Sequence, residues 1–430
     1  MLLIENGYVI DPKSETEGNF DLLIQDGIIM KMRPKLRNHL TDAQLADCKV
    51  IDAQGLLIGP GLVDIHVHFR DPGFPEKEDI DSGTKAAAAG GYTTVVMMAN
   101  THPVLDSPDI IKDICQKSFS TPIHTYLCGA VTKGLLGMEL TDMQALQIAG
   151  AIGFSDDGKA ICSKETLQKA LIMAAQLDMP ISLHEEDPSM IKQNGIHHGK
   201  ASDFFQIEGS PREAEISMIA RDLELAAKFP ATLNIQHIST KEGVELVRRA
   251  KRKGLRVHAE ATPHHFSLTQ DDLIRYGSMA KINPPLREAS DRFAIITGII
   301  DGTIDLIATD HAPHTLSEKE RSLTDAPSGM IGLETALALG LTELVNQGYL
   351  TVKTLLQKMS TNPANLYHLD AGYLEEGGPA DLILVDTTAV WQPETYHSRS
   401  SNTPFTGRTL QGSVVMTICG GNIVYTKEIV

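Results

Sequence analysis

Cysteine is scarce in this chain and forms no recognisable pattern. The 430 residues contain five cysteines, scattered and odd in number, with no Cys-x-x-Cys pair among them. A disulfide framework and a cysteine zinc site are therefore both disfavoured. The first residues, Met-Leu-Leu-Ile-Glu-Asn-Gly, carry an acid where a signal peptide carries bases, and we expect a reducing, cytoplasmic setting.

Long apolar runs and an excess of positive charge are also missing. No segment is apolar over the length that a bilayer requires, so we expect no membrane association. A formal net charge of -17 argues against nucleic-acid binding. It leaves room for a small anionic substrate, because a local arginine or a metal ion can override the global field.

Two common catalytic patterns are absent as well. Gly90-Gly91 is not followed by the Gly-Lys-Ser/Thr of a phosphate loop. No Gly-x-Ser-x-Gly elbow occurs anywhere in the chain. Phosphate-loop chemistry and a serine nucleophile are therefore disfavoured.

The middle of the chain alternates between short apolar runs and helical stretches. Helices are predicted at Ser163–Leu177, Pro211–Lys228 and Lys241–Lys253. Such alternation predicts a parallel α/β sheet, either a closed TIM (β/α)8 barrel or an open doubly wound sheet. Polar residues recur at the carboxyl ends of the runs, where barrel enzymes carry their active sites, and this favours the barrel. The predicted strands are Leu62–Phe69, Thr93–Asn100, Ile123–Val131, Ala151–Asp157, Pro180–Glu186, Thr232–Ser239, Arg256–Thr262 and Asp305–His311.

Both ends of the chain have a different texture, with strands and turns but no long helices. We expect the two ends to form one small β-sandwich domain from residues 1–55 and 366–430, around a hydrolase barrel at 56–365. Its predicted strands are Leu2–Ile10, with a hairpin signal at Asn6-Gly7, Asp21–Ile29, with a turn at Asp26-Gly27, Val50–Ile58, Ala380–Asp386, and Val414–Tyr425, with a hairpin at Gly420-Gly421.

The most informative segment is Gly61-Leu-Val-Asp-Ile-His-Val-His-Phe-Arg-Asp-Pro-Gly73. Alternate residues of a strand share a face, so His66 and His68 point the same way at its carboxyl end. Two such imidazoles are suited to metal binding. Asp64 shares their face but lies deeper, and we interpret it as structural. The nearby Arg70 is a cation suited to binding a carboxylate.

Similar donors follow other strands of the predicted barrel. Four imidazoles and two carboxylates are too many for one catalytic zinc, which has three protein ligands and an open position. Two metal ions, about 3.5–4 Å apart, would use them all if one carboxylate bridges. Such a pair activates a water and polarises a carbonyl, as hydrolysis of an amide requires. The donors are His66, His68, one of Asp156 and Asp157, His184, His237 and Asp310.

The remaining histidine pairs have weaker claims. His197-His198 is predicted to be a solvated loop pair. His264-His265 follows the seventh predicted strand and has a smaller claim to line the site than the donors above.

At this point the chain resembles a known family. His66-Val-His-Phe-Arg-Asp-Pro-Gly73, Ala308-Thr-Asp-His-Ala-Pro-His314, His184 and His237 closely resemble the dihydroorotases, above all their bacterial class I branch within the cyclic amidohydrolases. The resemblance covers essentially the whole chain. It implies reversible ring closure of N-carbamoyl-L-aspartate to dihydroorotate in pyrimidine synthesis. Similar allantoinases usually have Asn where Arg70 stands, and hydantoinases usually have another residue there.

The resemblance also implies two zinc ions per subunit. His66 and His68 would hold one with Asp310, while His184 and His237 would hold the other. Asp310 would also be the catalytic residue, moving a proton from a metal-activated hydroxide to the ring nitrogen.

The bridging position is less determined. The resemblance implies Asp157 as the bridge, but Asp156 is its rival, because adjacent strand residues face opposite ways. Other branches use a carboxylated lysine, for which Lys159 is the fallback.

Substrate contacts follow from the same resemblance. Arg70 would pair with the substrate carboxylate, while Ser328 stands where a bulkier apolar residue is expected and would act through its backbone. The full set of implied contacts is His68, Arg70, Asn100, Asn283, His314, Ser328 and Gly329.

Several expectations remain open at this level. The loop at 315–327 is either a lid over the substrate or a solvated loop. A homodimer and an association with aspartate carbamoyltransferase are expected by family analogy. The rival functions are allantoinase or another cyclic amidase, and a non-catalytic dihydroorotase-like partner.

Overall fold

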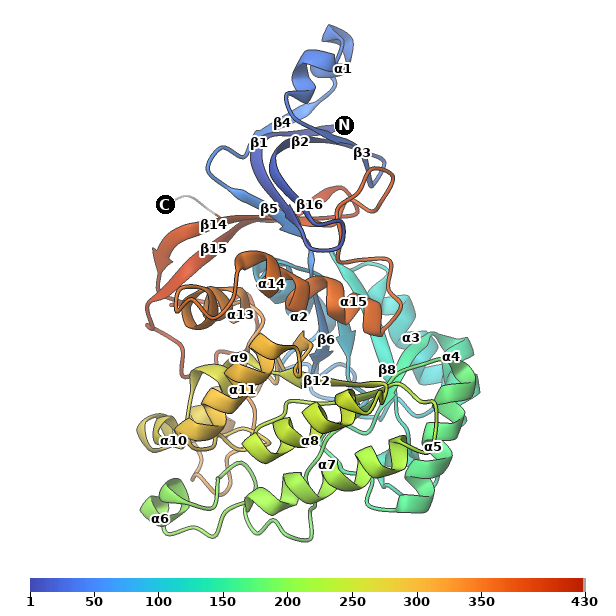
Figure 1. Ribbon diagram of the computed structural model, residues 1–430, viewed down its shortest axis with the longest axis vertical. Helices are drawn as coiled ribbons and strands as arrows, with labels where there is room; N and C mark the ends of the chain where they lie inside the picture. The colour runs from blue at the N-terminus through green and yellow to red at the C-terminus, as the bar shows by residue number, and fades with distance from the viewer. Residues whose placement is uncertain (428–430) are drawn as a thin grey trace.

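The computed structural model describes residues 1–427 and contains two separate sheets of eight strands each (Figure 1). One sheet is parallel and closes on itself. Its first and last strands meet through a bridge between Val67 and His311, and the His68 N–H donates to the His311 carbonyl at 2.8 Å. The predicted barrel is therefore confirmed, and the open doubly wound sheet is excluded.

The barrel strands agree with the predicted runs but end earlier. Each predicted run begins at or near the observed strand, and the polar residues at its end lie just beyond the ladder. The strands are β6 (Leu62–Val67), β7 (Tyr92–Met97), β8 (His124–Gly129), β9 (Ala151–Ser155), β10 (Ile181–Leu183), β11 (Leu233–Ile235), β12 (Val257–Ala261) and β13 (Leu306–Ile307).

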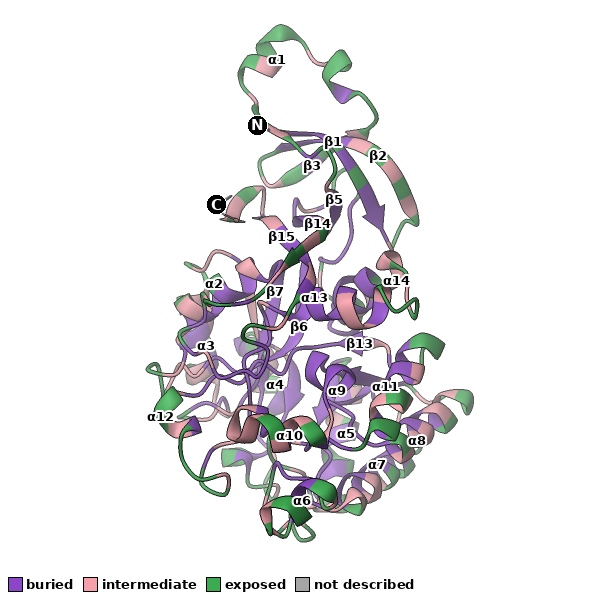
Figure 2. Ribbon diagram, turned by 90° about the vertical axis from the view of Figure 1, so that its left-hand side faces the viewer, coloured by how far each residue is buried: buried purple, intermediate pink, exposed green. Residues whose placement is uncertain are grey.

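Amphipathic helices surround this barrel. In α8 (Lys241–Arg252), Val244, Val247 and Ala250 recur on one helical face and are buried, while Arg249 is exposed. Figure 2 shows the same division, with buried strands inside and exposed outer helix faces. The short helix α1 (Asp42–Ala46) lies away from the barrel, beyond the N-terminal strands in Figure 1. The other α-helices are α2 (Ile80–Ala89), α3 (Pro108–Ser118), α4 (Met143–Ala149), α5 (Lys164–Leu177), α6 (Lys200–Phe205), α7 (Arg212–Ala226), α9 (Pro263–Ser267), α10 (Gln270–Tyr276), α11 (Ala289–Asp301), α12 (Leu316–Lys319), α13 (Ala336–Gly340), α14 (Val352–Leu356) and α15 (Asn362–Leu366).

The second sheet joins the two ends of the chain. The blue N-terminal strands and the red C-terminal strands lie side by side above the barrel in Figure 1. Apolar residues from both ends of the chain, such as Ile4, Leu22 and Leu382, share one buried cluster on this single sheet. The strands are β1 (Leu2–Asp11), β2 (Thr16–Gln25), β3 (Ile28–Arg33), β4 (Lys49–Asp52), β5 (Leu57–Pro60), β14 (Leu382–Trp391), β15 (Leu410–Cys419) and β16 (Asn422–Thr426).

Two local predictions for this sheet are wrong. Asn6-Gly7 forms no hairpin, because β1 runs straight through it with a register shift between Ile4 and Gly7. A side chain at Gly7 would clash with Ile58, its Cβ lying 2.2 Å from Ile58 Cδ1, so this glycine serves close packing. The single strand predicted at 50–58 is two strands, β4 and β5. By contrast, the turns at Asp26-Gly27 and Gly420-Gly421 are confirmed.

Candidate metal centre and active site

Strand ends of the barrel bring six imidazole and carboxylate side chains to one place. They leave the carboxyl ends of five different strands, β6, β9, β10, β11 and β13. All six are buried. The sequence predicted this set, and the structure brings all of its members together: His66, His68, Asp157, His184, His237 and Asp310.

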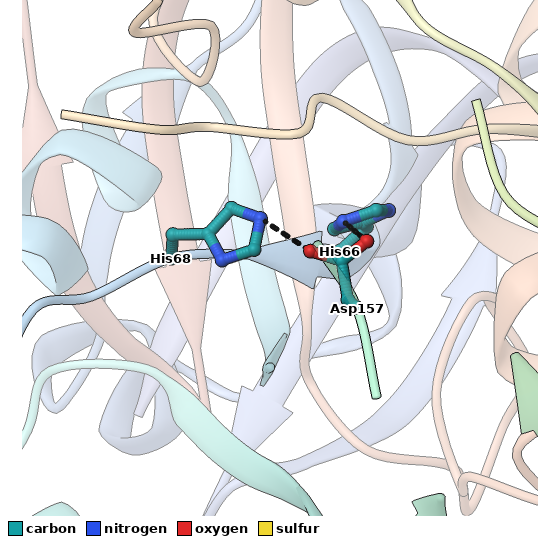
Figure 3. Close-up of side chains that lie close together, drawn as sticks. All are labelled: His66, His68 and Asp157. Atoms are coloured by element: carbon teal, nitrogen blue, oxygen red, sulfur yellow. Dashed lines mark ion pairs between the residues drawn. The ribbon is translucent and has the colours of Figure 1, made fainter. Parts of the chain in front are cut away.

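The first group of donors lies at the end of β6 (Figure 3). The Asp157 carboxylate reaches both imidazoles, with Oδ1 3.3 Å from His66 Nε2 and Oδ2 3.2 Å from His68 Nε2. Asp310 Oδ1 lies 2.9 Å from His68 Nε2 and 3.6 Å from His66 Nε2. Such spacing lets several side chains reach one ion.

The second group shares Asp157 with the first. Asp157 Oδ1 lies 3.7 Å from His184 Nδ1 and 3.5 Å from His237 Nε2. The two imidazoles approach each other to 3.0 Å. Donor atoms of Asp157, His184 and His237 all lie within 4.8 Å of one another, as do those of His66, His68 and Asp157. Asp157 is therefore placed between two potential metal positions.

The positions of the donor atoms are better suited to binding a cation than to hydrogen bonding with one another. Within residues 1–427, His66 Nε2 and Asp157 Oδ1 are buried and have no hydrogen-bond partner, although they lie 3.3 Å apart. A buried polar atom without a partner costs about 1–3 kcal/mol. Imidazole nitrogens and carboxylate oxygens are ligands that zinc and similar divalent ions accept. The arrangement is therefore suited to metal binding.

The electrostatics of the cluster favour positive charge between the carboxylates. Burial opposes ionisation of Asp157, but the imidazoles of His66, His184 and His237 outweigh it and hold the pKa of this carboxyl well below its ordinary value. Burial likewise opposes a charged His184, yet Asp157 and Glu186 raise the pKa of its imidazole to about 10. Carboxylates that stabilise an imidazolium also stabilise a bound cation, which would displace such protons.

A second layer of polar groups fixes the imidazole rings. Glu260 Oε2 lies 3.0 Å from His66 Nδ1, Asn100 Oδ1 lies 2.8 Å from His68 Nδ1, and Glu186 Oε2 lies 3.2 Å from His184 Nε2. Partners of this kind set ring orientation and ligand basicity. The sequence analysis did not identify Glu260, although a lone acid within the strand Val257–Ala261 could have indicated a functional residue. It also did not identify Glu186, and no sequence pattern pointed to that residue.

The two neighbouring aspartates after β9 have different surroundings. Asp156 Oδ1 accepts the N–H groups of Val131 at 2.7 Å and Thr132 at 3.0 Å, so its carboxylate faces a neighbouring loop. Burial raises the pKa of Asp156 to about 6. Lys159 is exposed. Of these three residues, only Asp157 lies among the imidazoles.

Two of the donors have unusual backbone conformations. His237 has φ 31° and Asp310 has φ 49°, in the left-handed region that residues with a side chain rarely adopt. Such conformations cost about 1–3 kcal/mol each and cluster at functional sites. The fold maintains them here at two of the five contributing strand ends.

The residues expected to contact substrate lie on the same rim. Arg70 Nη2 is 3.4 Å from His314 Nε2, which lies 3.0 Å from the Ser328 carbonyl oxygen. Burial and the nearby Arg70 lower the pKa of His314 to about 2, so this imidazole is neutral. Asn283 and Ser328 line a cavity of about 1070 Å³ together with His184. Asn100 instead binds the donors, since its amide contacts His68 and the Asp157 carbonyl.

Asn402, far from these residues in the sequence, binds the loop that carries His314 and Gly329. The sequence analysis did not predict this contact. Asn402 is fully buried; its Oδ1 accepts the His314 N–H at 3.0 Å, and its amide donates to Ala312 and Gly329 carbonyls, each at 3.1 Å.

The segment at 315–327 is held in place by hydrogen bonds from a lysine side chain. Lys319 donates to the carbonyls of Pro327 and Gly329, both at 2.9 Å.

The other histidines differ in part from expectation. His197 is not solvated: it is 1% exposed, and its Nδ1 lies 3.2 Å from Arg287 Nη1. His198 is exposed as predicted. His265 is buried in contact with Thr262 and the Pro284 carbonyl. Asp64 accepts the N–H groups of His66 and Thr309, which agrees with a structural role.

A parallel barrel with buried imidazoles and carboxylates at the carboxyl ends of its strands is typical of metal-dependent hydrolases. The Amidohydrolase family profile matches residues 57–424. The chain belongs to the amidohydrolase family.

Three relatives that match this chain over nearly its full length are dihydroorotases. A dihydroorotase of Clostridioides difficile is 48% identical over 425 residues, covering 99% of this chain and 100% of the relative. One of Clostridium acetobutylicum is 47% identical over 430 residues, covering 100% of both. Another, from Lactococcus lactis, is 48% identical over 428 residues, covering 99% of this chain and 100% of the relative.

Solved structures agree on the fold. L-hydantoinase (dihydropyrimidinase) of Arthrobacter aurescens superposes with a TM-score of 0.87 at 25% identity, covering 100% of this chain and 97% of that one. A dihydropyrimidinase of Brevibacillus agri gives 0.85 at 24% identity, covering 99% and 95%. The barrel and its accessory sheet are thus shared with proteins of quite different sequence.

Proposed function

We propose that this chain is a dihydroorotase of the class I branch, which reversibly cyclises N-carbamoyl-L-aspartate to (S)-dihydroorotate and water. Full-length identity of 47–48% to dihydroorotases supports this. The structural observation that carries the proposal is Arg70, a guanidinium at the rim of the donor cluster, with Nη2 3.4 Å from His314 Nε2. This substrate carries a carboxylate that needs such a cation, whereas dihydrouracil and allantoin do not.

We propose two Zn²⁺ ions per chain as the cofactor. His66, His68 and Asp310 would hold one ion, His184 and His237 the other, and Asp157 would bind both. The buried, unpartnered His66 Nε2 and Asp157 Oδ1 support this assignment. The surroundings of Asp156 and the exposure of Lys159 argue against either as the bridge.

Two zinc ions held by these residues would supply Lewis acidity, which lowers the pKa of water and polarises an amide carbonyl. In the ring-opening direction, the substrate amide reacts with a water. The water oxygen bonds to the carbonyl carbon, and the bond from that carbon to the ring nitrogen breaks. Asp310 accepts the proton of the water and delivers it to the departing nitrogen. His68 Nε2, 2.9 Å from Asp310 Oδ1, holds that carboxylate in place.

The remaining side chains orient the substrate. Arg70 pairs with the substrate carboxylate, aided by His314, and this pairing turns binding energy into positioning. Asn283 and the backbone of Ser328-Gly329 bind the ring edges; the buried Asn283 Oδ1 has no partner within the described chain and supports this role. Asn100 and His68 touch the substrate from the metal side, where Asn100 also positions His68.

The test is a comparison of three substrates on zinc-reconstituted protein. We expect ring opening of dihydroorotate with a kcat/KM about 100-fold or more above that for dihydrouracil or allantoin, because only dihydroorotate uses Arg70 fully. Preference for allantoin or dihydrouracil would favour the second candidate, another cyclic amidase. Absence of turnover on all three after zinc is restored would instead indicate a non-catalytic partner.

Further proposals concern the setting of the enzyme. We propose a cytoplasmic protein, on the basis of its scattered free cysteines. Within residues 1–427, no helix is long and apolar enough to span a membrane. A homodimer and an association with aspartate carbamoyltransferase rest on family resemblance and are tested by size measurement with and without that protein.

We also propose the domain division at 1–55, 56–365 and 366–430, although β5 (Leu57–Pro60) pairs with β1 and β14 of the small sheet. For the loop at 315–327 we propose a fixed wall over the cavity. The carbonyls that Lys319 and Lys281 bind within it support this.

A further inference from the structure

A second cluster of metal-ligating side chains lies outside the proposed active site. Donor atoms of His124, Asp381 and Cys419 all lie within 4.8 Å of one another. The imidazole and the carboxylate are in contact, with His124 Nε2 2.9 Å from Asp381 Oδ2. No sequence motif indicates this group, because its members come from three separate parts of the chain.

The cluster is at the opposite end of the barrel from the proposed zinc centre. His124 is the first residue of β8, whereas the catalytic donors follow the carboxyl ends of their strands. Asp381 immediately precedes β14, and Cys419 ends β15. In Figure 1 the red strands β14 and β15 lie between the barrel and the blue N-terminal strands. The cluster therefore joins the barrel to the small sheet.

Backbone pairing sets these donors in place without help from a ligand. The antiparallel register pairs Leu382 with Ile418, so Asp381 comes opposite Cys419. The Asp381 carbonyl accepts the Gly61 N–H at 2.9 Å, and its Oδ1 accepts the Gly420 N–H at 2.6 Å. One carboxylate oxygen is thus fixed by the backbone, and the other faces the imidazole, as second-shell support of a metal ligand requires.

Charge and access both suit a divalent ion. Asp381 and Cys419 side chains are buried, while the His124 side chain is 43% exposed. A cavity of about 480 Å³, lined by His124 and Cys419, gives an entry path and room for a water as fourth ligand. A thiolate and a carboxylate would balance the two positive charges, and the protons of the imidazole and thiol would leave to solvent.

We propose that His124, Asp381 and Cys419 form a binding site for a thiophilic divalent cation, of the Zn²⁺ or Cd²⁺ type, which fastens the small sheet to the barrel. One nitrogen, one oxygen and one sulfur ligand, with an open fourth position, match the coordination that zinc accepts. The site is separate from the proposed catalytic centre and takes no part in its chemistry.

Cadmium provides a direct probe of this site. The proposed catalytic centre contains no cysteine, so a sulfur-to-cadmium charge-transfer band reports thiolate coordination elsewhere. Zinc-loaded protein is titrated with Cd²⁺ while this ultraviolet band is recorded. We expect saturation at one equivalent and a rise in the thermal midpoint of unfolding.

Matched variants assign the band. Cys419→Ser is expected to abolish it, and His124→Ala to weaken Cd²⁺ binding about tenfold or more. Cys162→Ser, which removes the exposed thiol, is expected to keep both band and affinity. Ring-opening activity and the circular dichroism spectrum of the His124 and Cys419 variants verify that they fold.

Two results would overturn the proposal. One is the absence of any charge-transfer band in the unmodified protein, which would leave His124 and Asp381 as an ion pair beside a thiol. The other is a band that persists in folded Cys419→Ser. Neither result bears on the dihydroorotase assignment, because that assay uses the zinc centre at the other end of the barrel.

Discussion

The two ends of β13 each carry an aspartate, and the surroundings of the two are opposite. Asp305, before the strand, is an ion-pair partner of Lys251 and accepts the Ala259 N–H at 3.2 Å. Asp310, after the strand, has a left-handed backbone and a carboxylate 2.9 Å from His68 Nε2. Asp305 at the base is thus satisfied by its partners, whereas Asp310 at the mouth is crowded by other donors and has a strained backbone. The surroundings of Asp305 favour stability, and those of Asp310 are typical of a functional site that costs stability.

The largest difference between the two ends of β13 is expected when one carboxylate charge is removed at each end. We expect Asp310→Asn to lower kcat about 1,000-fold, because the proton acceptor is lost while the other ligands remain. Asp305→Asn should keep near-native turnover and lose about 1 kcal/mol or less of stability, since its ion pair is partly exposed. Steady-state kinetics, zinc content and denaturant unfolding of both variants test this. Near-native kcat in zinc-replete Asp310→Asn would defeat the shuttle assignment.

The next largest effect is expected at Arg70, which we propose binds the substrate carboxylate at the mouth of the barrel. Arg70→Met should lower kcat/KM for dihydroorotate about 100-fold, because charge-assisted hydrogen bonds contribute about 1.5–3 kcal/mol each. Dihydrouracil, which has no carboxylate, is the matched control and should react equally with both proteins. An unchanged value for dihydroorotate would remove Arg70 from the site.

A smaller effect is expected where a distant segment braces the mouth. Asn402→Ala leaves the His314 N–H and two buried carbonyls without their side-chain partner, at about 1–3 kcal/mol. KM should rise, because the loop that carries His314 and Gly329 loses its brace. Asn346→Ala, which removes a surface amide, is the control and should change neither KM nor stability. Equal KM values for the two variants would contradict the bracing role.

The smallest effect is at the junction of barrel and small sheet. The protonated His124 imidazole donates hydrogen bonds to Asp381 and Cys419, and these raise its pKa to about 10. A raised histidine pKa stabilises the fold below the unfolded value of about 6.5, and the effect is lost as pH rises through 10. His124→Asn should therefore lower stability by about 1 kcal/mol or less near pH 6 and by nothing above pH 10. Thermal unfolding in chelator, at both pH values, measures the difference. A deficit that persists above pH 10 would contradict the ion pair.

Much of the barrel could be predicted because its strands are short apolar runs with polar ends. Those ends located His66, His184, His237 and Asp310, since in a parallel barrel such positions meet at one mouth. Local hairpin signals were less reliable. Asn6-Gly7 has the residues of a tight turn, but packing against Ile58 keeps β1 straight there.

What the sequence could not supply were partners from unrelated segments. Nothing near Asn402 marks it as a neighbour of His314, because the contact depends on how the C-terminal segment crosses the barrel. The same holds for His197, whose burial follows from its contact with Arg287. The different surroundings of Asp156 and Asp157 could not be predicted either, since both residues follow the same strand and only their partners differ.

Zinc content is the most direct measure of whether one carboxylate serves two metal positions. Zinc-reconstituted Cys419→Ser protein, which lacks the thiol of the site proposed at the base of the barrel, and its Asp157→Asn and Asp156→Asn derivatives are compared by elemental analysis after removal of free metal. We predict two tightly held zinc ions per chain in Cys419→Ser and in its Asp156→Asn derivative, and one or fewer in its Asp157→Asn derivative. Two zinc ions retained in the folded Asp157→Asn derivative, or fewer than two in Cys419→Ser itself, would contradict the shared centre.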